Sequence, residues 1–374
     1  MKKFVSIFIC IVFVMLSGTI ANANSFVSSN SAQGAYILTE TCPQDVVDFA
    51  KTSFDSFSYS DEHPNSQIEL GTPFSLTNED MERTLYYFPV IINEQIEYTY
   101  RIFYSNGWQY VLSECLAEEL NSASEYSTVS NPTIVYLNDN SNIVVQNSKY
   151  ESTVIVDPTR NAMSKNSIKN TVSYVDKFNE LNSGQATTVV NMLSKIKTIN
   201  YYEMINTRAS SAKSKYLSPT IRERQGPLPW CAGYVTAYIV SYKTGTAYYA
   251  REVAQFAGSS ETEGISRSKC VRFAKDKGLS NTRETIFDAS DNTMMEQIDN
   301  SCPVYVGADL IGSDSSHAFA VIGYSWSGSA ITNWRVWNPW NNYTEDISSR
   351  AYSTADGSAV FDDWESFIIN FNND

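Results

Sequence analysis

The chain has 374 residues and 43% of them are hydrophobic, which is the composition of a globular protein long enough for two or three domains. Asp and Glu number 41 against 27 Lys and Arg, so the formal net charge is -14. This balance excludes a nucleic-acid backbone as the main partner, because such binding needs clustered cationic side chains. An acidic surface mainly confers solubility and identifies no basic partner.

The first 23 residues have the pattern of a secretory signal peptide. A basic start at Met1–Lys3 precedes the apolar run Phe4–Leu16, and Ala21–Ala23 gives the small-x-small cleavage pattern. The apolar run is too short for a membrane span, and Cys10 lies inside it, where lipid attachment is disfavoured. We therefore expect a secreted protein whose mature chain begins near residue 24, with no stable membrane insertion.

The pattern predicts a β-rich domain over residues 24–206. Aromatic and β-branched residues alternate in short runs that end at turn-forming residues such as Ser105–Gly107. The spacing of Val189, Met192, Leu193, Ile196 and Ile199 predicts a helix over 186–199. The strands expected in this region are 84–92, 97–104, 108–115, 133–137, 143–145 and 150–156.

A small, polar and basic stretch without periodicity follows, and it predicts a linker over residues 207–216. Its Arg and Lys residues are suited to cleavage by a trypsin-like protease or by the chain itself; the alternative is an ordinary linker that is never cut. The remaining residues, 217–374, place helices before strands, which is typical of an α+β domain with a cleft between the two parts. The expected helices are 231–242, 247–256, 267–277 and 293–298, and the expected strands are 304–310, 318–324, 334–337 and 360–370.

Five cysteines remain after removal of the signal peptide, and an odd number outside the cell leaves one thiol unpaired. Their spread suggests Cys42 with Cys115 and Cys270 with Cys302, leaving Cys231 free. The alternative is that none is bridged and most are small buried hydrophobic residues. The two histidines, His63 and His317, stand in no metal-ligand spacing, so we expect no metal and no cofactor.

Cys231 is the first candidate for chemistry. It follows the turn-forming sequence Gly-Pro-Leu-Pro and opens a helical pattern in which Val235, Tyr238 and Ile239 share its face. A thiol at a helix N-terminus feels the positive end of the helix dipole, which favours the thiolate. Gln225 lies six residues upstream, close enough to contribute to an oxyanion hole with the backbone N–H of Cys231.

His317 and Asn338 complete the candidate site. His317 stands at the mouth of an apolar strand, and Asn338 ends the next strand, so a hairpin would bring them to the same end of a sheet. The imidazole would take the thiol proton and later protonate the leaving amine, while Asn338 would orient the ring. Singly, each residue is more often a core thiol, a structural histidine or a turn former. Their joint order, with Gln225 and Cys231, favours catalysis.

These residues carry a resemblance to a known family. Gln225 and Cys231 with their spacing, the string Trp230–Tyr234, His317–Ala318 before an apolar strand, and Trp337–Trp340 resemble the staphopains, a group within the papain-like cysteine proteases. The resemblance covers about residues 217–374. It implies a helical left subdomain with the cysteine, an antiparallel β-barrel-like right subdomain with histidine and asparagine, and protein or peptide substrates.

The resemblance also implies synthesis as a zymogen whose N-terminal pro-domain occupies the cleft and acts as an intramolecular inhibitor. A dedicated protein inhibitor is a further partner that it suggests. By the match, Cys231 is the nucleophile, His317 the acid and base, Asn338 the orienting residue and Gln225 the oxyanion donor. Trp230, Gly233 and Trp340 are expected at the substrate cleft, Trp340 as a hydrophobic shield over the His–Asn pair.

Three other functions remain open at this stage. A cell-wall amidase acting on peptidoglycan also uses a cysteine and a histidine, and a transglutaminase-like acyl transferase shares the acyl-enzyme. A secreted binding protein whose C-terminal domain is catalytically silent is the non-enzymatic alternative.

Overall fold

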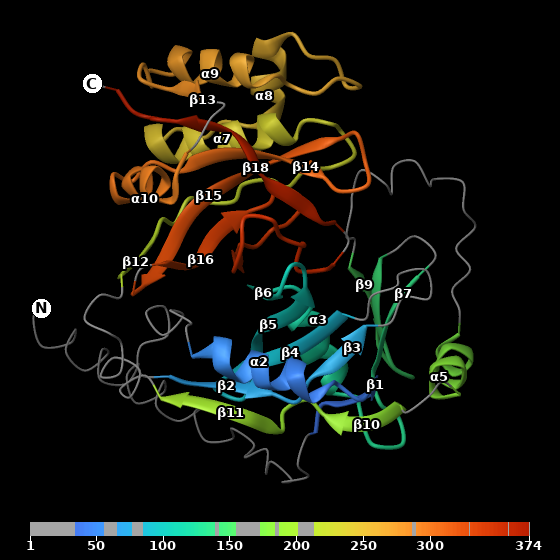
Figure 1. Ribbon diagram of the computed structural model, residues 1–374. Helices are drawn as coiled ribbons and strands as arrows, with labels where there is room; N and C mark the ends of the chain where they lie inside the picture. Colours follow the sequence, from blue (N-terminus) through green and yellow to red (C-terminus); the bar gives the residue numbers. More distant parts are fainter. Residues whose placement is uncertain are drawn as a thin grey trace, which may run out of the picture. The chain divides into compact units, whose positions relative to one another are not determined.

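The computed structural model describes the chain from Gly34 onward, with gaps. The described residues are 34–55, 66–76, 85–138, 142–154, 173–183, 187–200, 213–285, 289–328, 330–357 and 359–373 (Figure 1). The predicted signal peptide, His63 and residues 207–212 of the predicted linker lie outside these ranges. Every pairing between named strands in the described part is antiparallel, and the helices are separate from the sheets, so the α+β prediction is confirmed.

A β-meander forms the centre of the N-terminal region, as the alternating aromatic and β-branched residues predict. Its strands pair in sequence order through short turns, and Asn93 and Glu94 take positive φ in the first of these turns. The strands are β4 (Leu85–Ile92), β5 (Gln95–Tyr104) and β6 (Trp108–Ser113). Shorter strands extend the region: β1 (Tyr36–Glu40), β2 (Gln67–Gly71), β3 (Phe74–Leu76), β7 (Ile134–Leu137), β8 (Ile143–Gln146) and β9 (Glu151–Val154).

The helix predicted over 186–199 is wrong, because this segment forms two strands. They are β10 (Thr187–Asn191), which pairs with β1, and β11 (Lys195–Asn200), which pairs with β2. Seven of their residues are Thr, Val or Ile, at positions 187–190, 196, 198 and 199, and these side chains fit a pleated surface better than a helix. Pairing to distant strands outweighs the helical spacing that the apolar residues also satisfy.

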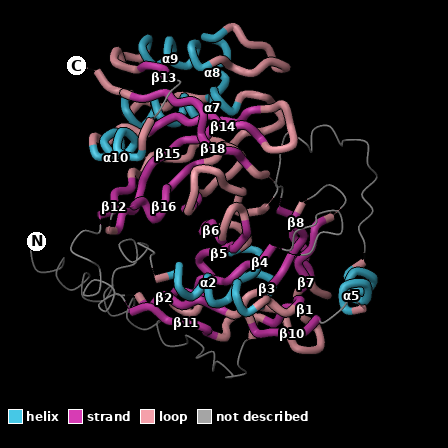
Figure 2. Tube along the Cα trace, viewed as in Figure 1, coloured by secondary structure: helices cyan, strands magenta, loops and turns pink. Residues whose placement is uncertain are grey.

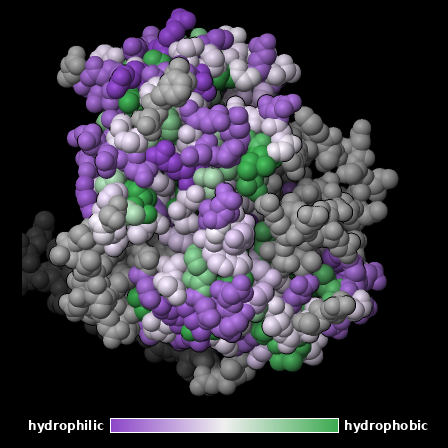
Figure 3. Space-filling model, viewed as in Figure 1, coloured by the Kyte–Doolittle hydropathy of each residue, from purple (hydrophilic) through white to green (hydrophobic). Residues whose placement is uncertain are grey.

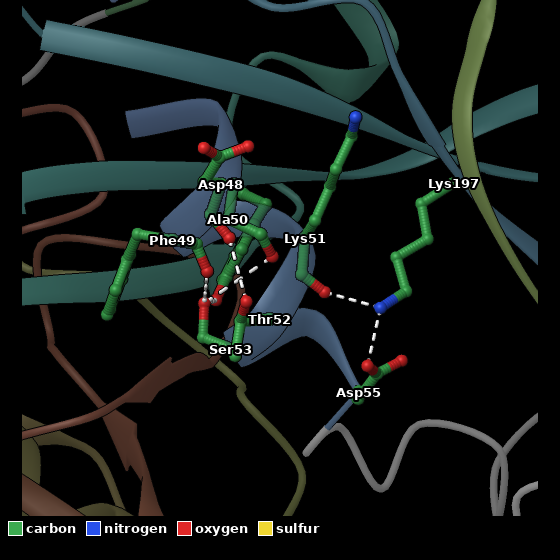
Figure 4. Close-up of polar contacts among 9 residues, drawn as sticks. Asp48, Phe49, Ala50, Lys51, Thr52, Ser53, Asp55 and Lys197 are labelled. Atoms are coloured by element: carbon green, nitrogen blue, oxygen red, sulfur yellow. Dashed lines mark hydrogen bonds and ion pairs between the residues drawn. The ribbon is translucent and has the colours of Figure 1, made fainter. Parts of the chain in front are cut away.

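Helices that were not predicted pack against the N-terminal strands. In α2 (Gln44–Phe54) the side chains of Val46, Ala50 and Phe54 pack into a core shared with β2, β4 and β5. Figure 4 shows how its last turn is closed: Lys197 of β11 donates to the carbonyl of Lys51 and pairs with Asp55. A cation there satisfies a carbonyl that the helix itself leaves free. The other helices of this region are α3 (Ala117–Ser124) and α5 (Tyr174–Asn182).

The C-terminal region opens with helices close to those predicted. Helix α7 (Cys231–Thr244) is followed by Gly245, which takes a left-handed φ of 72° that favours glycine. Figure 2 shows these helices gathered beside the C-terminal strands, and the face drawn in Figure 3 is mainly hydrophilic over α8 and α9, whose apolar sides are buried. The helices are α7 (Cys231–Thr244), α8 (Ala250–Ala257), α9 (Arg267–Asp276) and α10 (Asp291–Asp299).

The C-terminal strands form a sheet against which α7 packs. The predicted strands are all present as β14 (Val304–Leu310), β15 (Ser316–Ser327), β16 (Ala330–Trp337) and β18 (Phe361–Ile369). Three short strands were not expected: β12 (Lys213–Tyr216), β13 (Arg283–Thr285) and β17 (Glu345–Ile347). Strand β12 falls inside the stretch read as linker, but it pairs with β15, and Gly323 leaves the space that the Tyr216 ring fills.

One sheet runs through both regions. Its order is β11-β2-β4-β5-β6-β17-β16-β15-β14-β18-β13, and the join is the pairing of β6 with β17. Side chains reinforce the join: Tyr110 Oη donates to Thr332 O at 2.8 Å and Tyr87 Oη donates to Ala355 O at 2.9 Å. The N-terminal region is therefore hydrogen-bonded to the half that carries the candidate catalytic residues. None of the helices in the described ranges combines the length and apolarity needed to cross a membrane.

Candidate active site

Cys231 is the first residue of α7, immediately after Trp230, whose non-helical backbone forms the N-terminal cap. The prolines of the preceding Gly-Pro-Leu-Pro stretch disfavour helix, so the helix begins at the cysteine. The Cys231 side chain is half-buried. Sequence reasoning therefore placed the thiol correctly at a helix N-terminus.

The pKa of the Cys231 thiol is shifted in the direction opposite to the one that the helix dipole predicts. Burial raises the pKa of Cys231, and the backbone N–H groups of Ala318, Ala232 and Cys231 itself lower it by less. The net pKa lies above that of an ordinary cysteine. Burial therefore opposes the helix dipole, which alone would favour the thiolate.

His317 and Asn338 lie together at one end of the β15–β16 hairpin. The register aligns Ala320 with Trp337, which brings the start of β15 and the residues after β16 to the same edge. His317 Nε2 lies 2.9 Å from Asn338 Oδ1, and both side chains are buried, with Asn338 fully so. Because Nε2 faces the amide oxygen, it is the nitrogen that carries the hydrogen in this contact.

Aromatic rings enclose the imidazole. The Trp340 ring lies over His317 with a centroid separation of 4.2 Å and an interplanar angle of 33°, and Phe361 lies at 5.5 Å. The backbone N–H of Trp340 donates to Asn338 Oδ1 at 3.0 Å. Trp340 therefore excludes water from the His–Asn contact and also fixes the amide oxygen.

Gln225 is buried beside the same group. Its backbone N–H donates to Pro339 O at 2.6 Å, and its side-chain Nε2 donates to Leu228 O at 2.8 Å. A primary amide has two N–H donors, so one remains besides the bond to Leu228. The side chain lines the cleft, and its Oε1 has no hydrogen-bond partner in the described part of the chain.

A cleft of about 970 Å³ brings these residues together. Gln225, Cys231, His317 and Trp340 all line it, together with residues 261, 262 and 264–268, which lead into α9. Its volume lies in the range of ordinary ligand sites. The described residues that line it all belong to the C-terminal region, so the inhibitory occupation of the cleft by the N-terminal region remains a prediction.

Trp230 and Gly233 are not among the described residues that line the cleft. Trp230 is buried and its indole N–H donates to Ser260 O at 3.0 Å. Gly233 faces the neighbouring helix, where an added Cβ would lie 2.7 Å from Ile265 Cδ1 and 3.4 Å from Ala250 O. Both residues act in packing here, Gly233 because it permits close approach of the α7 and α8 backbones.

The two predicted disulfides are absent, since the five cysteines in the described part of the chain are free. Cys42 contacts the core beneath α2, whereas Cys115 is buried in the main core. Cys270 Sγ donates to Ala232 O at 3.7 Å, and Cys302 Sγ donates to Phe371 O at 3.8 Å. Burial raises the pKa of Cys42 and of Cys270 to about 12, so both behave as inert hydrophobic residues.

Comparison with known proteins shows that the similarity extends over almost the whole chain. Staphopain A of Staphylococcus aureus strain Mu50 is 24% identical over 380 residues, which cover 93% of this chain and 94% of the relative. The chain is staphopain-like. Staphopain A of strain MRSA252 is 24% identical over 396 residues, or 96% and 97% of the two chains. An extracellular cysteine protease of Staphylococcus epidermidis is 22% identical over 334 residues, or 83% and 80%.

No family model matches this staphopain-like chain. The similarity to the relatives nevertheless extends over nearly their full length, so it includes the N-terminal β region, in which the sequence carried no recognisable motif.

Sequence reasoning missed part of the cleft of the staphopain-like chain. The lining of the cleft also contains Arg267 and Glu284, whose Nε and Oε1 atoms are 2.7 Å apart, and Tyr305. These residues come from the first turn of α9, the three-residue strand β13 and the buried strand β14. None has a spacing or motif that marks it as part of a site.

Proposed function

We propose that this staphopain-like chain is a secreted cysteine endopeptidase with a papain-like catalytic domain over residues 217–374. The helices α7–α9 would form the part that carries Cys231, and the β14–β18 sheet the part that carries His317 and Asn338. Support comes from the cleft between the cysteine and the histidine and from the relatives, one of which is an extracellular cysteine protease.

The proposed mechanism uses four residues. His317 Nε2–H is held by Asn338 Oδ1, which leaves Nδ1 to accept the proton of the Cys231 thiol. The thiolate attacks the peptide carbonyl carbon, and the developing oxyanion accepts hydrogen bonds from the Cys231 backbone N–H and the remaining N–H of Gln225. The imidazolium then protonates the leaving amine, and water hydrolyses the thioester with His317 as the base.

The N-terminal region would restrain this activity in the precursor. The pairing of β6 with β17, which joins this region to the sheet that carries His317, supports such a role. Cleavage in the linker before β12 would produce the active form, and the N-terminal region would act until then as an intramolecular inhibitor. We include secretion through the predicted signal peptide in this proposal.

The observation that carries the proposal is the position of Cys231 and His317 on the wall of one cleft, with His317 held by Asn338 at 2.9 Å. The test is hydrolysis of casein and of peptidoglycan by the secreted protein, with and without an epoxide inhibitor of papain-like proteases. Cys231→Ala should abolish release of casein peptides. Cys302→Ala is the matched control, since it removes a buried thiol outside the cleft and should retain activity.

Activity on peptidoglycan alone would favour the cell-wall amidase instead. Unchanged activity in Cys231→Ala would remove the cysteine mechanism altogether. Absence of any hydrolysis by processed wild-type protein would favour a binding protein.

A further inference from the structure

A group of buried polar side chains lies behind the His–Asn contact, outside the cleft. Glu345 of β17 is fully buried, and Tyr352 and Arg101 are each 1% exposed. Arg101 comes from β5 of the N-terminal region, and Tyr352 from the segment that leads into β18. Charged residues are rarely buried so completely unless they are paired or serve a function.

Three polar atoms in this group lack hydrogen-bond partners in the described part of the chain. They are Asn338 Nδ2, Tyr352 Oη and Glu345 Oε2, and each is buried. They are also neighbours, since the Tyr352 hydroxyl lies within hydrogen-bonding reach of the Asn338 amide and of the Glu345 carboxyl. Burial raises the pKa of the Tyr352 phenol, the charge of Glu345 raises it further, and the Asn338 amide lowers it. A native structure leaves few such atoms unpaired, so three together require a reason.

Asn338, Tyr352 and Glu345 form a line of side chains along which hydrogen bonds can run from the Asn338 amide to the Glu345 carboxyl. An amide N–H of Asn338 can donate to the Tyr352 phenol oxygen, and the phenol O–H can donate to a Glu345 carboxyl oxygen that carries no proton, whether or not the other oxygen is protonated. Asn338 Oδ1 is already occupied by His317 and by the Trp340 N–H. An acceptor on the Nδ2 side therefore selects the amide orientation that presents oxygen, and not nitrogen, to the histidine.

Two hydrogen bonds connect the N-terminal region to the chain segment that follows Tyr352. Arg101 Nη2 donates to Ser353 O at 3.1 Å, and Tyr87 Oη donates to Ala355 O at 2.9 Å. The Ala355 N–H in turn donates to Glu345 Oε1 at 2.7 Å. Arg101 and Tyr87 thus hold the segment that carries Tyr352 and the carboxylate that faces it.

Resting on the cysteine protease mechanism proposed above, we infer that Tyr352 and Glu345 are positioning residues for Asn338, and that Arg101 of the N-terminal region anchors them. Arg101 acts only while the N-terminal region is attached, whereas Tyr352 and Glu345 stay with the processed C-terminal region. The simpler reading is that Tyr352 only fills the core, since its ring packs against Phe319 and Phe361 at 5.5 and 5.4 Å.

Tyr352→Phe separates the two readings, because it keeps the ring and removes the hydroxyl. Tyr238→Phe is the matched control: its hydroxyl is also buried and unpaired in the described part of the chain, and its ring packs on Trp337 at 4.2 Å. The first measurement is the steady-state kinetics of the processed protein, which gives kcat and KM. We expect Tyr352→Phe to lower kcat about 3- to 10-fold with KM within about twofold, and Tyr238→Phe to change neither.

The second readout is the NMR titration of His317 in the full chain, which needs no activity. The sequence has two histidines, so a His63→Gln background leaves one imidazole to follow. Tyr352→Phe should move the His317 titration midpoint, and Glu345→Gln and Arg101→Met should move it too. These two variants also keep the test decisive if Tyr352→Phe does not fold.

An unmoved His317 titration in Tyr352→Phe and Glu345→Gln would overturn the inference, and so would an equal kcat loss in Tyr238→Phe. If wild-type protein hydrolyses neither casein nor peptidoglycan, the proposed function fails, while the titration still decides whether this line positions Asn338.

Discussion

The buried ion pair between Arg335 and Asp346 gives the sharpest prediction of stability. The two residues are register partners on β16 and β17. Arg335 Nε and Nη2 donate to the two Asp346 carboxylate oxygens at 2.9 and 3.2 Å, and the side chains are 7% and 0% exposed. The Tyr216 ring covers the guanidinium at 3.9 Å from its centroid. Such a bidentate, desolvated pair is a strong interaction once it is formed.

Asp346→Ala leaves the guanidinium buried without its carboxylate, so we expect a loss of about 3–5 kcal/mol in the free energy of unfolding. Urea unfolding of the full chain, followed by tryptophan fluorescence, measures it. Asp276→Ala is the control. It breaks the surface pair of Asp276 and Lys277, whose side chains are 50% and 28% exposed respectively. This substitution should lower the free energy of unfolding by less than about 1 kcal/mol.

Replacing both partners by apolar residues, in Arg335→Met with Asp346→Leu, should recover much of the loss, because no unpaired charge remains. If Asp346→Ala costs no more than the surface control, Arg335 is not the desolvated charge that the structure describes, and the reasoning fails.

Three further predictions follow from the site and its surroundings. Mass analysis should place the N-terminus of the processed form between residues 207 and 213, because a cut after Tyr216 would strip β12 from the sheet; an active form starting at 217 or later contradicts this. Burial raises the pKa of Cys231, so alkylation of this thiol in the full chain should require higher pH than for an exposed cysteine, and equal pH profiles would contradict it. Burial raises the pKa of Glu345 to about 8, so the folded chain binds more protons than the unfolded chain between about pH 4.5 and 8, and stability should fall as pH rises through that window. Glu345→Gln should flatten the slope, and an unchanged slope would assign it to other groups.

Much of the C-terminal region could be predicted because its signals are local. Cys231 follows prolines and opens an apolar helix, and His317 and Asn338 mark the ends of two adjacent strands. Such short-range signals can be interpreted without knowledge of the rest of the fold. The protonation state of Cys231 could not be read in the same way, because burial depends on side chains from several elements.

The predictions that were wrong concern contacts between residues that are distant in the sequence. The segment 186–199 satisfies helical spacing, but β1 and β2 supply strand partners more than 100 residues upstream. No pattern indicated that β6 would pair with β17, since strand pairing leaves no mark in a single sequence. The disulfide prediction was wrong because cysteine spacing says nothing about which core each thiol enters.

The join between β6 and β17 has a consequence for the proposed processing. Removal of the N-terminal strands would leave β17 as an edge strand whose backbone groups could pair with another chain. This edge is only three residues long. So short an edge offers few backbone groups for pairing with another chain, which discourages self-association at the point where processing would expose it.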